Sequence, residues 1–163
     1  TDLGTMRGFD EIIVATGSVP RTKPMIPGFE KTLSFTELLK EKKEVGDKVL
    51  FFGGGQSSCE AAYDLILQGK HPIIVEYAGD LVAAQVPTYL HSTITEIHDG
   101  GVTVKGQDGK TFDVECDNVV NGIGFVPAPV GEKGRHVHRV GDCVAIGNLR
   151  TVIWRAWDVC MKI

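Results

Sequence analysis

Residues Lys48–Glu76 read KVLFFGGGQSSCEAAYDLILQGKHPIIVE, and the architecture of the chain follows from this segment. Its apolar start, Lys48–Phe52, is typical of a buried strand that the following glycines bring to an end. Ser57–Gln68 then carries apolar residues at helical spacing, and Gly69 stands where a C-terminal cap belongs. Because Ile73–Val75 supplies a second short strand, the segment predicts a β-α-β unit of the usual size, about thirty residues.

The turn between this strand and helix reads Gly53-Gly54-Gly55-Gln56-Ser57-Ser58. It fits the pattern G-x-G-x-x-G, with Ser58 in the place of the third glycine. In this pattern Gly53 permits the tight turn, Gly55 lets the backbone approach a pyrophosphate, and a small third residue lets the helix pack on the strand. The helix N-terminus then offers free N–H groups and partial positive charge to the phosphates. Serine departs from the pattern but is small enough, so the turn predicts a dinucleotide site.

Glu76 ends the second strand, where an acidic side chain accepts hydrogen bonds from the ribose hydroxyls of a bound dinucleotide. Such a carboxylate repels the 2′-phosphate of NADPH, and Tyr77–Tyr89 holds no arginine that would bind it. These residues favour NADH over NADPH. The alternative interpretation is a glycine-rich turn followed by an ordinary surface glutamate.

The rest of the chain adds further strands and helices to this unit. Thr93–Ile97, Val102–Lys105 and Thr111–Glu115 alternate apolar and polar residues between Asp-Gly turns, which is typical of an antiparallel meander. The fold class expected is therefore α/β, a Rossmann-like three-layer parallel sheet with an antiparallel three-stranded meander. Other expected elements are a strand in Phe9–Ala15, a short polar helix from Ser34 to about Lys43 with a capping box at Ser34 and Glu37, a strand at Asn118–Val120, and a helix from about Leu149 to Ile163.

The composition narrows the classes of function. Hydrophobic residues make up 42% and charged residues 23%, which is typical of a globular protein. A net charge of -4 argues against nucleic acid or an anionic membrane as the main partner. We see no signal peptide and no apolar run near the ~18 residues that span a membrane. The spacing of Cys59, Cys116, Cys143 and Cys160 suits no metal knuckle or redox dithiol, so we expect free thiols, no metal site and a cytoplasmic location.

Four segments occur in an order that resembles pyridine-nucleotide-dependent flavoprotein reductases. They are FDEIIVATGSVPRTKPMIPG from Phe9, KVLFFGGGQSSCEAA from Lys48, NVVNGIGFVPAP from Asn118 and VGDCVAIGNLRTVIWRAWDVCMKI from Val140. The last is most similar to the C-terminal part of the 2,4-dienoyl-CoA reductase and enoate reductase group. These are NADH:flavin oxidoreductases related to old yellow enzyme, and the resemblance covers nearly the whole chain.

The resemblance implies a domain organisation and the roles of further residues. An NAD(H)-binding Rossmann domain, residues 25–136, would be inserted between two remnants of an FAD-binding domain, residues 1–24 and 137–163. Glu60 would lie near the nicotinamide, or alternatively be a structural partner of a neighbouring group. The residues implied on the nicotinamide side of the NAD(H) cleft are Gly122, Ile123 and Gly124. Those implied on the FAD side are Thr16 and Gly17, where the chain leaves the FAD domain, and Gly141 and Asp142, in the motif whose aspartate contacts the flavin.

In the parent enzyme that the resemblance implies, NADH gives hydride to FAD, and the electrons reduce an enoate- or dienoyl-type C=C bond. The FMN and iron–sulfur cluster of that family belong to an N-terminal barrel absent here, as is the first G-x-G-x-x-G that binds the FAD pyrophosphate. The partners expected are a dinucleotide and the rest of the parent flavoenzyme. We assign no catalytic acid or base and expect no turnover by this chain alone. The alternatives are a stand-alone dinucleotide-binding or sensing module without redox chemistry, and a domain that lost nucleotide binding.

Two connections are shorter than this fold leads us to expect. The run Tyr77–Gln85 is too short for the crossover helix and loops that usually join parallel strands, and the chain is also short after Pro129. We expect residues to be missing between Gly79 and Val86 and between Ala128 and His136. Consecutive Cα atoms would then lie farther apart there than the ~3.8 Å of a trans peptide. The alternative is a genuine deletion, with the meander pairing directly to the edge of the sheet.

Overall fold

The computed structural model describes residues 3–79 and 86–163, which form two compact units. The central unit is Thr22–Gly124, and the terminal unit combines the residues up to Arg21 with Phe125–Ile163. The expected Rossmann segment ran on to residue 136, whereas Phe125–His136 lie in the terminal unit. The reason is long-range pairing, because β10 (Phe125–Pro127) runs antiparallel to β2 (Ser18–Pro20).

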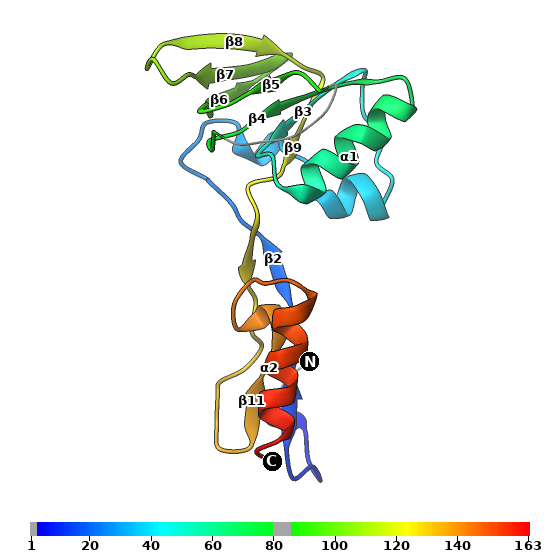
Figure 1. The fold of residues 1–163 in the computed structure, drawn as a ribbon, viewed down its shortest axis with the longest axis vertical. Helices are drawn as coiled ribbons and strands as arrows, with labels where there is room; N and C mark the ends of the chain where they lie inside the picture. Colours follow the sequence, from blue (N-terminus) through cyan, green and yellow to red (C-terminus); the bar gives the residue numbers. More distant parts are fainter. Residues whose placement is uncertain (1–2, 80–85) are drawn as a thin grey trace. The chain divides into compact units, whose positions relative to one another are not determined.

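The central unit is built on a parallel sheet with the strand order β5-β4-β3-β9 (Figure 1). Strand β3 (Lys48–Phe52) lies between β4 (His71–Val75) and β9 (Asn118–Asn121) and pairs with both in parallel. Strand β5 (Thr88–Tyr89) adds a short parallel edge to β4. Helix α1 (Gln56–Leu67) joins β3 to β4, so the predicted β-α-β unit is confirmed.

The two faces of this sheet are covered by different layers. Val49 and Phe51 of β3 belong to an apolar cluster that includes α1 residues Ala61, Ala62 and Leu65. Leu50 and Phe52, which alternate with them, belong to a second cluster with the meander residues Ile94, Val102 and Val104. Each such side chain, fully buried, contributes roughly 1.5–3 kcal/mol. Helix, parallel sheet and antiparallel sheet are therefore three layers, as the alternation within the strand requires.

The meander itself is as predicted. Strands β6 (Thr93–His98), β7 (Gly101–Lys105) and β8 (Thr111–Glu115) pair antiparallel in the order β6-β7-β8, with an irregularity between Ile94 and Glu96. The fold class expected from the sequence is confirmed.

The helix expected from Ser34 to about Lys43 is wrong in length. Only a π-helical turn, η3 (Thr36–Lys40), forms there. The capping box is present, since Ser34 N–H donates to Glu37 Oε2 at 2.8 Å and Glu37 N–H to Ser34 Oγ at 3.2 Å. Leu38 is the buried side chain of this turn, and Lys42 adopts a left-handed φ of 51°. The segment stops early because it has no continuous apolar face to bury. A shorter turn, η2 (Phe29–Lys31), precedes it.

The terminal unit contains two short strand pairs and one long helix. Strand β1 (Ile12–Val14) pairs in parallel with β11 (Val137–Arg139), alongside the β2–β10 pair. The short turns η1 (Leu3–Thr5) and η4 (Gly141–Cys143) flank these strands in the sequence. Helix α2 (Leu149–Cys160) begins with a capping box between Asn148 and Thr151. No helix among residues 3–79 and 86–163 is both long and apolar enough to cross a membrane.

The two short connections have different outcomes. The expected interruption between Gly79 and Val86 falls largely on residues 80–85, which lie outside the described residues. In the described part, β5 and not the meander pairs with the edge strand β4. Between Ala128 and His136 the chain is held by a hydrogen bond from Ala128 N–H to Gly17 O, 3.0 Å, and by the bridge of Gly134 with Val137. These contacts do not test whether residues are missing, so both expectations stay predictions.

Candidate functional site

The glycine turn after β3 is held by the end of β9. Gly53 has a φ of 105°, and its N–H donates to Val75 O at 2.8 Å. A Cβ added at Gly53 would lie 2.5 Å from Gly122 O, and one added at Gly122 would lie 2.3 Å from Ser58 Oγ. Gly53, Gly122 and Ser58 therefore pack against one another, and any larger side chain would push α1 away from the sheet.

Gly55 differs from Gly53 and Gly122 in its backbone angles and in the space around its Cα. Its φ of -62° and ψ of 168° suit any residue. Among the described residues, no atom lies within 4 Å of a Cβ added there. Gly55 is also the N-cap of α1, and no described side chain caps this helix. Neither packing against the described residues nor backbone conformation requires a glycine here. In the motif G-x-G-x-x-G, a glycine at this position lets the backbone approach a pyrophosphate.

Ser58 fills the third position of the pattern. Ser58 is 1% exposed, and its hydroxyl has no hydrogen-bond partner among the described residues. A buried hydroxyl without a partner costs about 1–3 kcal/mol. The serine is thus accepted for its small size rather than for a bond that it makes.

Glu76 lies beside the glycine turn, as the spacing predicts. Its Oε2 accepts a hydrogen bond from Gly54 N–H, and its Oε1 accepts one from Ala78 N–H at 2.7 Å. The carboxylate is thereby fixed at the carboxyl end of β4, next to the N-terminus of α1. It brings negative charge to the place where a ribose would present its hydroxyls.

The first turn of α1 presents Gln56, Ser57 and Glu60 at the surface. Gln56 Nε2 donates to Glu60 Oε1 at 2.8 Å, so Glu60 has a structural partner on its own helix. Cys59 lies between them, and its thiol donates to Gly54 O at 3.5 Å. Burial raises the pKa of the Cys59 thiol, and the charges of Glu60 and Glu76 raise it further. The pattern of the motif did not point to Cys59, although this residue directly follows Ser58.

The three residues after β9 do not behave alike. Gly122 packs on the turn, as described above. Ile123 directs its side chain against the apolar cluster that contains Phe52, and its N–H donates to Asn121 Oδ1 at 3.3 Å. Gly124 has a φ of 93°, with no described atom within 4 Å of an added Cβ. Of the three, only Gly124 leaves its backbone open to a ligand.

The residues expected on the FAD side follow the carboxyl ends of two paired strands. Val140 N–H donates to Val14 O at 2.9 Å, so Thr16-Gly17 and Gly141-Asp142 leave β1 and β11 at the same edge. Thr16 Oγ1 donates to Ala128 O at 2.7 Å, and Asp142 Oδ1 accepts from Gly147 N–H at 3.2 Å. In open parallel sheets this edge is where ligands bind.

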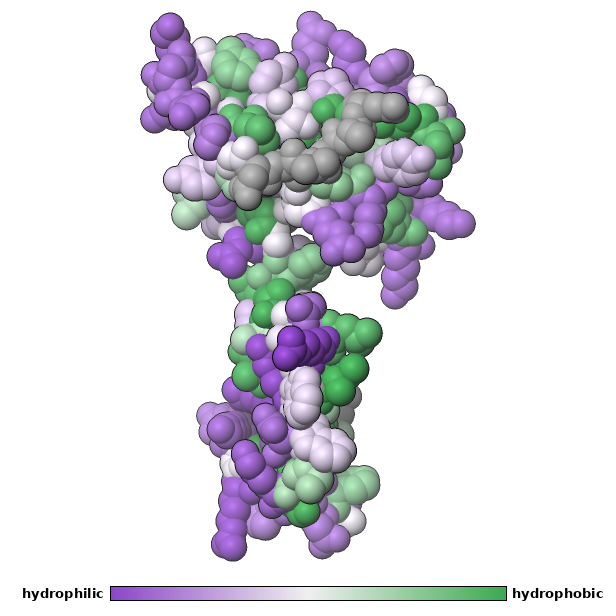
Figure 2. All heavy atoms as spheres, viewed as in Figure 1, coloured by the Kyte–Doolittle hydropathy of each residue, from purple (hydrophilic) through white to green (hydrophobic). Residues whose placement is uncertain are grey.

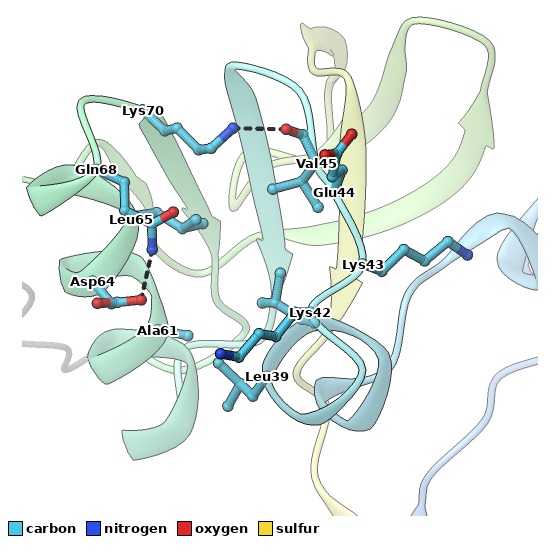
Figure 3. A pocket seen from close by; sticks show the side chains of 11 residues that line it. Leu39, Lys42, Lys43, Glu44, Val45, Ala61, Asp64, Leu65, Gln68 and Lys70 are labelled. Carbon is cyan, nitrogen blue, oxygen red and sulfur yellow. Dashed lines mark hydrogen bonds between the residues drawn. The ribbon is translucent and has the colours of Figure 1, made fainter.

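A hollow of the central unit lies elsewhere, along η3 and the second half of α1 (Figure 3). It has a volume of about 670 Å³. Lys70 Nζ donates to Val45 O at 2.7 Å at its rim, and Gln68 Nε2 to Asp64 Oδ2 at 2.8 Å. It is lined by Leu38, Leu39, Lys42, Lys43, Glu44, Val45, Ala61, Asp64, Leu65, Gln68 and Lys70. None of these is an expected site residue. Among the described residues, no three His, Cys, Asp or Glu side chains lie close enough to hold a metal ion.

Comparison with known proteins identifies what the chain is similar to. A family model described as pyridine nucleotide-disulphide oxidoreductase matches residues 4–153. Cinnamate reductase of Clostridium sporogenes is 30% identical over 180 residues, which cover 96% of this chain and 27% of that protein. NADH oxidase of Thermoanaerobacter brockii is 29% identical over 184 residues, covering 94% of this chain and 28% of that protein.

A solved structure agrees with these matches. The complex of 2-naphthoyl-CoA reductase with 2-naphthoyl-CoA has a TM-score of 0.80 and 28% identity, and the match covers 94% of this chain and 27% of that one. The chain thus spans about a quarter of the length of these relatives. The alignments of 180 and 184 residues are longer than the 163 residues of this chain. The two curated relatives therefore carry residues with no counterpart here.

Proposed function

Because the chain belongs to the pyridine nucleotide-disulphide oxidoreductase family, we propose that its central unit binds NADH at the turn Gly53–Ser58. One observation carries this proposal: Gly55 leaves bare backbone at the N-terminus of α1, and nothing in the described chain needs it bare. The turn, Glu76 and Gly122 all follow carboxyl ends of one parallel sheet. That edge is where dinucleotides bind in such folds.

The residues of this chain bind and orient the nucleotide in the proposal. The N–H groups of the first turn of α1, around Gln56 and Ser57, face the pyrophosphate. The carboxylate of Glu76 accepts from the ribose hydroxyls and disfavours a 2′-phosphate, which makes NADH the preferred form. Gly124 leaves room on the nicotinamide side, and Glu60 lies on the helix that begins at the turn. No residue here acts as acid or base, since the cofactor carries the redox chemistry.

In the same proposal, residues 1–24 and 137–163, most of which lie in the terminal unit, are two segments of an FAD-binding domain. Thr16-Gly17 and Gly141-Asp142 fit this role because their backbones leave parallel strands at one edge, with φ of 73° at Gly17 and 69° at Gly141. FAD, when bound, accepts hydride from NADH. We assign no residue of this chain to FMN or to an iron–sulfur cluster, which would belong to the rest of the parent protein.

For the parent protein we propose an NADH-dependent flavoenzyme of the cytoplasm that reduces an enoate- or dienoyl-type C=C bond. The names of two relatives, cinnamate reductase and 2-naphthoyl-CoA reductase, support a reductase of unsaturated acids or their thioesters. The name of a third, NADH oxidase, supports NADH as the electron donor. The alternative is a stand-alone dinucleotide-binding or sensing module without redox chemistry.

The substitution Gly55→Ala tests the binding site. Its backbone angles and open surroundings accept a Cβ, so we expect an unchanged thermal unfolding midpoint. NADH affinity, measured by calorimetry, should fall at least about tenfold, because the methyl group occupies the place of the pyrophosphate. Gly134→Ala, at another glycine with ordinary contacts, is the matched control and should alter neither quantity. Equal NADH affinity in Gly55→Ala and the unchanged chain would rule out this turn as the site.

A further inference from the structure

His91 lies against the loop that follows Glu76. Its N–H donates to Ala78 O at 3.2 Å, and the next residue, Ser92, donates its N–H to Glu76 O at 2.9 Å. A Cβ added at Gly79 would lie 2.2 Å from Cε1 and 2.6 Å from Nε2 of His91. The imidazole therefore occupies the space that a side chain at Gly79 would otherwise fill. Glu76, the loop after it and His91 form one connected group.

The backbone of His91 is held in an uncommon conformation. Its φ of 49° lies in the left-handed region, which non-glycine residues seldom adopt and where Asn, Asp and His are enriched. This conformation orients the side chain toward the Glu76 loop, and the residue is exposed to solvent. An exposed ring packed on Gly79, three residues after Glu76, is available to a ligand.

His91 differs in charge from the residues around it in the sequence. From Tyr77 to Ser92 the chain reads YAGDLVAAQVPTYLHS, and His91 is the only basic residue of this run. In Rossmann domains that use NADP, an arginine near the end of the second strand accommodates the 2′-phosphate. The run from Tyr77 to Ser92 contains no arginine that could take this role. An imidazole donates an N–H from at least one nitrogen in either protonation state, which a phosphate oxygen can accept.

We propose that His91 determines how far this site accepts NADPH beside NADH, by donating a hydrogen bond to the 2′-phosphate that Glu76 repels. The inference rests on the proposed function, because it assigns the specificity residue of the same site. Glu76 sets the preference for NADH, and His91 limits its extent. The unchanged chain then binds NADH more tightly than NADPH but binds both.

The experiment compares both nucleotides on the unchanged chain and three variants of it at pH 7.0, by fluorescence titration with NADH and NADPH. His91→Asn removes the ring and keeps a residue that tolerates the left-handed backbone. It should weaken NADPH binding about fivefold and leave NADH binding within about twofold. His91→Arg should strengthen NADPH binding by about the same factor, since arginine is the usual phosphate partner. His98→Asn, a histidine of β6 in the same unit, is the control and should change neither affinity.

Each outcome decides a different question. A loss confined to NADPH in His91→Asn, with a gain in His91→Arg, supports the assignment. Equal losses for both nucleotides would mean that His91 only supports the loop, and unchanged NADPH binding would mean that it does not reach the phosphate; either result overturns the inference and leaves the proposed function standing. If neither nucleotide binds the unchanged chain, the proposed function fails as well.

Discussion

At the scale of single residues, the glycines around the nucleotide motif differ in their surroundings. Gly53 and Gly122 are fixed by contacts within the chain, at distances that no Cβ can occupy, while a Cβ added at Gly55 would meet no atom of the described residues within 4 Å. Glu76 is tied to this turn through Gly54 N–H. Its carboxylate therefore has two tasks, holding the turn in the free chain and accepting the ribose in the proposed complex.

The role of Glu76 leads to a prediction on affinity. Glu76→Ala should weaken NADH binding by roughly 1.5–3 kcal/mol, the usual loss for hydrogen bonds to a charged acceptor. It should also narrow the preference over NADPH, because the repelling charge is gone. Calorimetry with both nucleotides measures these changes. Glu76→Gln keeps an oxygen that can accept from Gly54 N–H, so it distinguishes the effect of the lost charge from the effect of a lost contact with the turn. Glu96→Ala on β6 is the matched control. Equal NADH affinity in all forms would remove Glu76 from the site.

At the scale of elements, the contact of α1 with the sheet depends on Ser58. Its buried hydroxyl has no described partner and lies over Gly122. Ser58→Ala should therefore raise the free energy of unfolding of the central unit by about 1 kcal/mol. Ser58→Val should lower it by about 1–3 kcal/mol, since a methyl group in place of the hydroxyl and a second, additional methyl group overpack the contact. Urea unfolding followed by circular dichroism measures both, and a destabilised Ser58→Ala would show that the hydroxyl makes a bond.

Next to the paired strands β1 and β11, the carboxylate of Glu11 lies between two histidines. Glu11 Oε1 lies 3.0 Å from His136 Nδ1, and Glu11 Oε2 lies 2.7 Å from His138 Nε2. The hydrogen bonds of His136 and then His138 lower the pKa of Glu11 from 4.5. Because the folded pKa is the lower one, the contribution of Glu11 to stability is present above the unfolded value and is lost as pH falls through the folded value.

This arrangement predicts a pH-dependent stability of the terminal unit. Both tryptophans of the chain, Trp154 and Trp157, lie on α2, so tryptophan fluorescence reports on this unit. Glu11→Gln should lower the urea midpoint most above about pH 4.5, where the Glu11 carboxylate is ionised and the hydrogen bonds that lower its pKa contribute in full. The difference from the unchanged chain should shrink below about pH 4. Glu132→Gln serves as a control, and a pH-independent difference would contradict the ion-pair explanation.

At the scale of the whole molecule, the terminal unit leaves much apolar surface open. Side chains of α2 such as Ile153, Trp154 and Trp157 are each 57% exposed, and α2 buries no residue. Figure 2 shows hydrophobic residues at the surface of this unit among hydrophilic ones. Since the chain spans 27% of the cinnamate reductase that it matches, we expect further parts of an FAD domain to cover this helix in the parent protein.

The proposal that this chain carries only part of an FAD-binding domain predicts the colour of the purified chain. The 163-residue chain lacks the first G-x-G-x-x-G, whose backbone would hold the FAD pyrophosphate. We expect a colourless preparation with no flavin absorbance, even after incubation with FAD. The NADH titration on the same sample serves as the control for folding. A yellow protein with stoichiometric FAD would show that the terminal unit binds flavin without that loop.

Local signals in the sequence were enough for β3, the glycine turn, α1, β4 and the meander, because apolar periodicity, glycines and capping residues act within a few positions. They also led to Glu76, which ends a strand next to the motif. They do not report pairing and packing between distant segments. Because β2 pairs with β10, Phe125–His136 belong to the terminal unit. Burial against Phe52 and its neighbours turns the Ile123 side chain into the core.

Only the tertiary structure brings His91 to the Glu76 loop, because the contact joins two segments of the chain through backbone hydrogen bonds and a side chain that fills the space over Gly79. Likewise, the pattern G-x-G-x-x-G separates Gly53 from Gly55, but no pattern in the sequence distinguishes Gly122, which packing demands, from Gly124, which the described residues leave free. That difference depends on which atoms surround each Cα, and those atoms come from strands far apart in the chain. Periodicity thus defined the elements, and contacts between them defined which residues of the candidate site are open to a ligand.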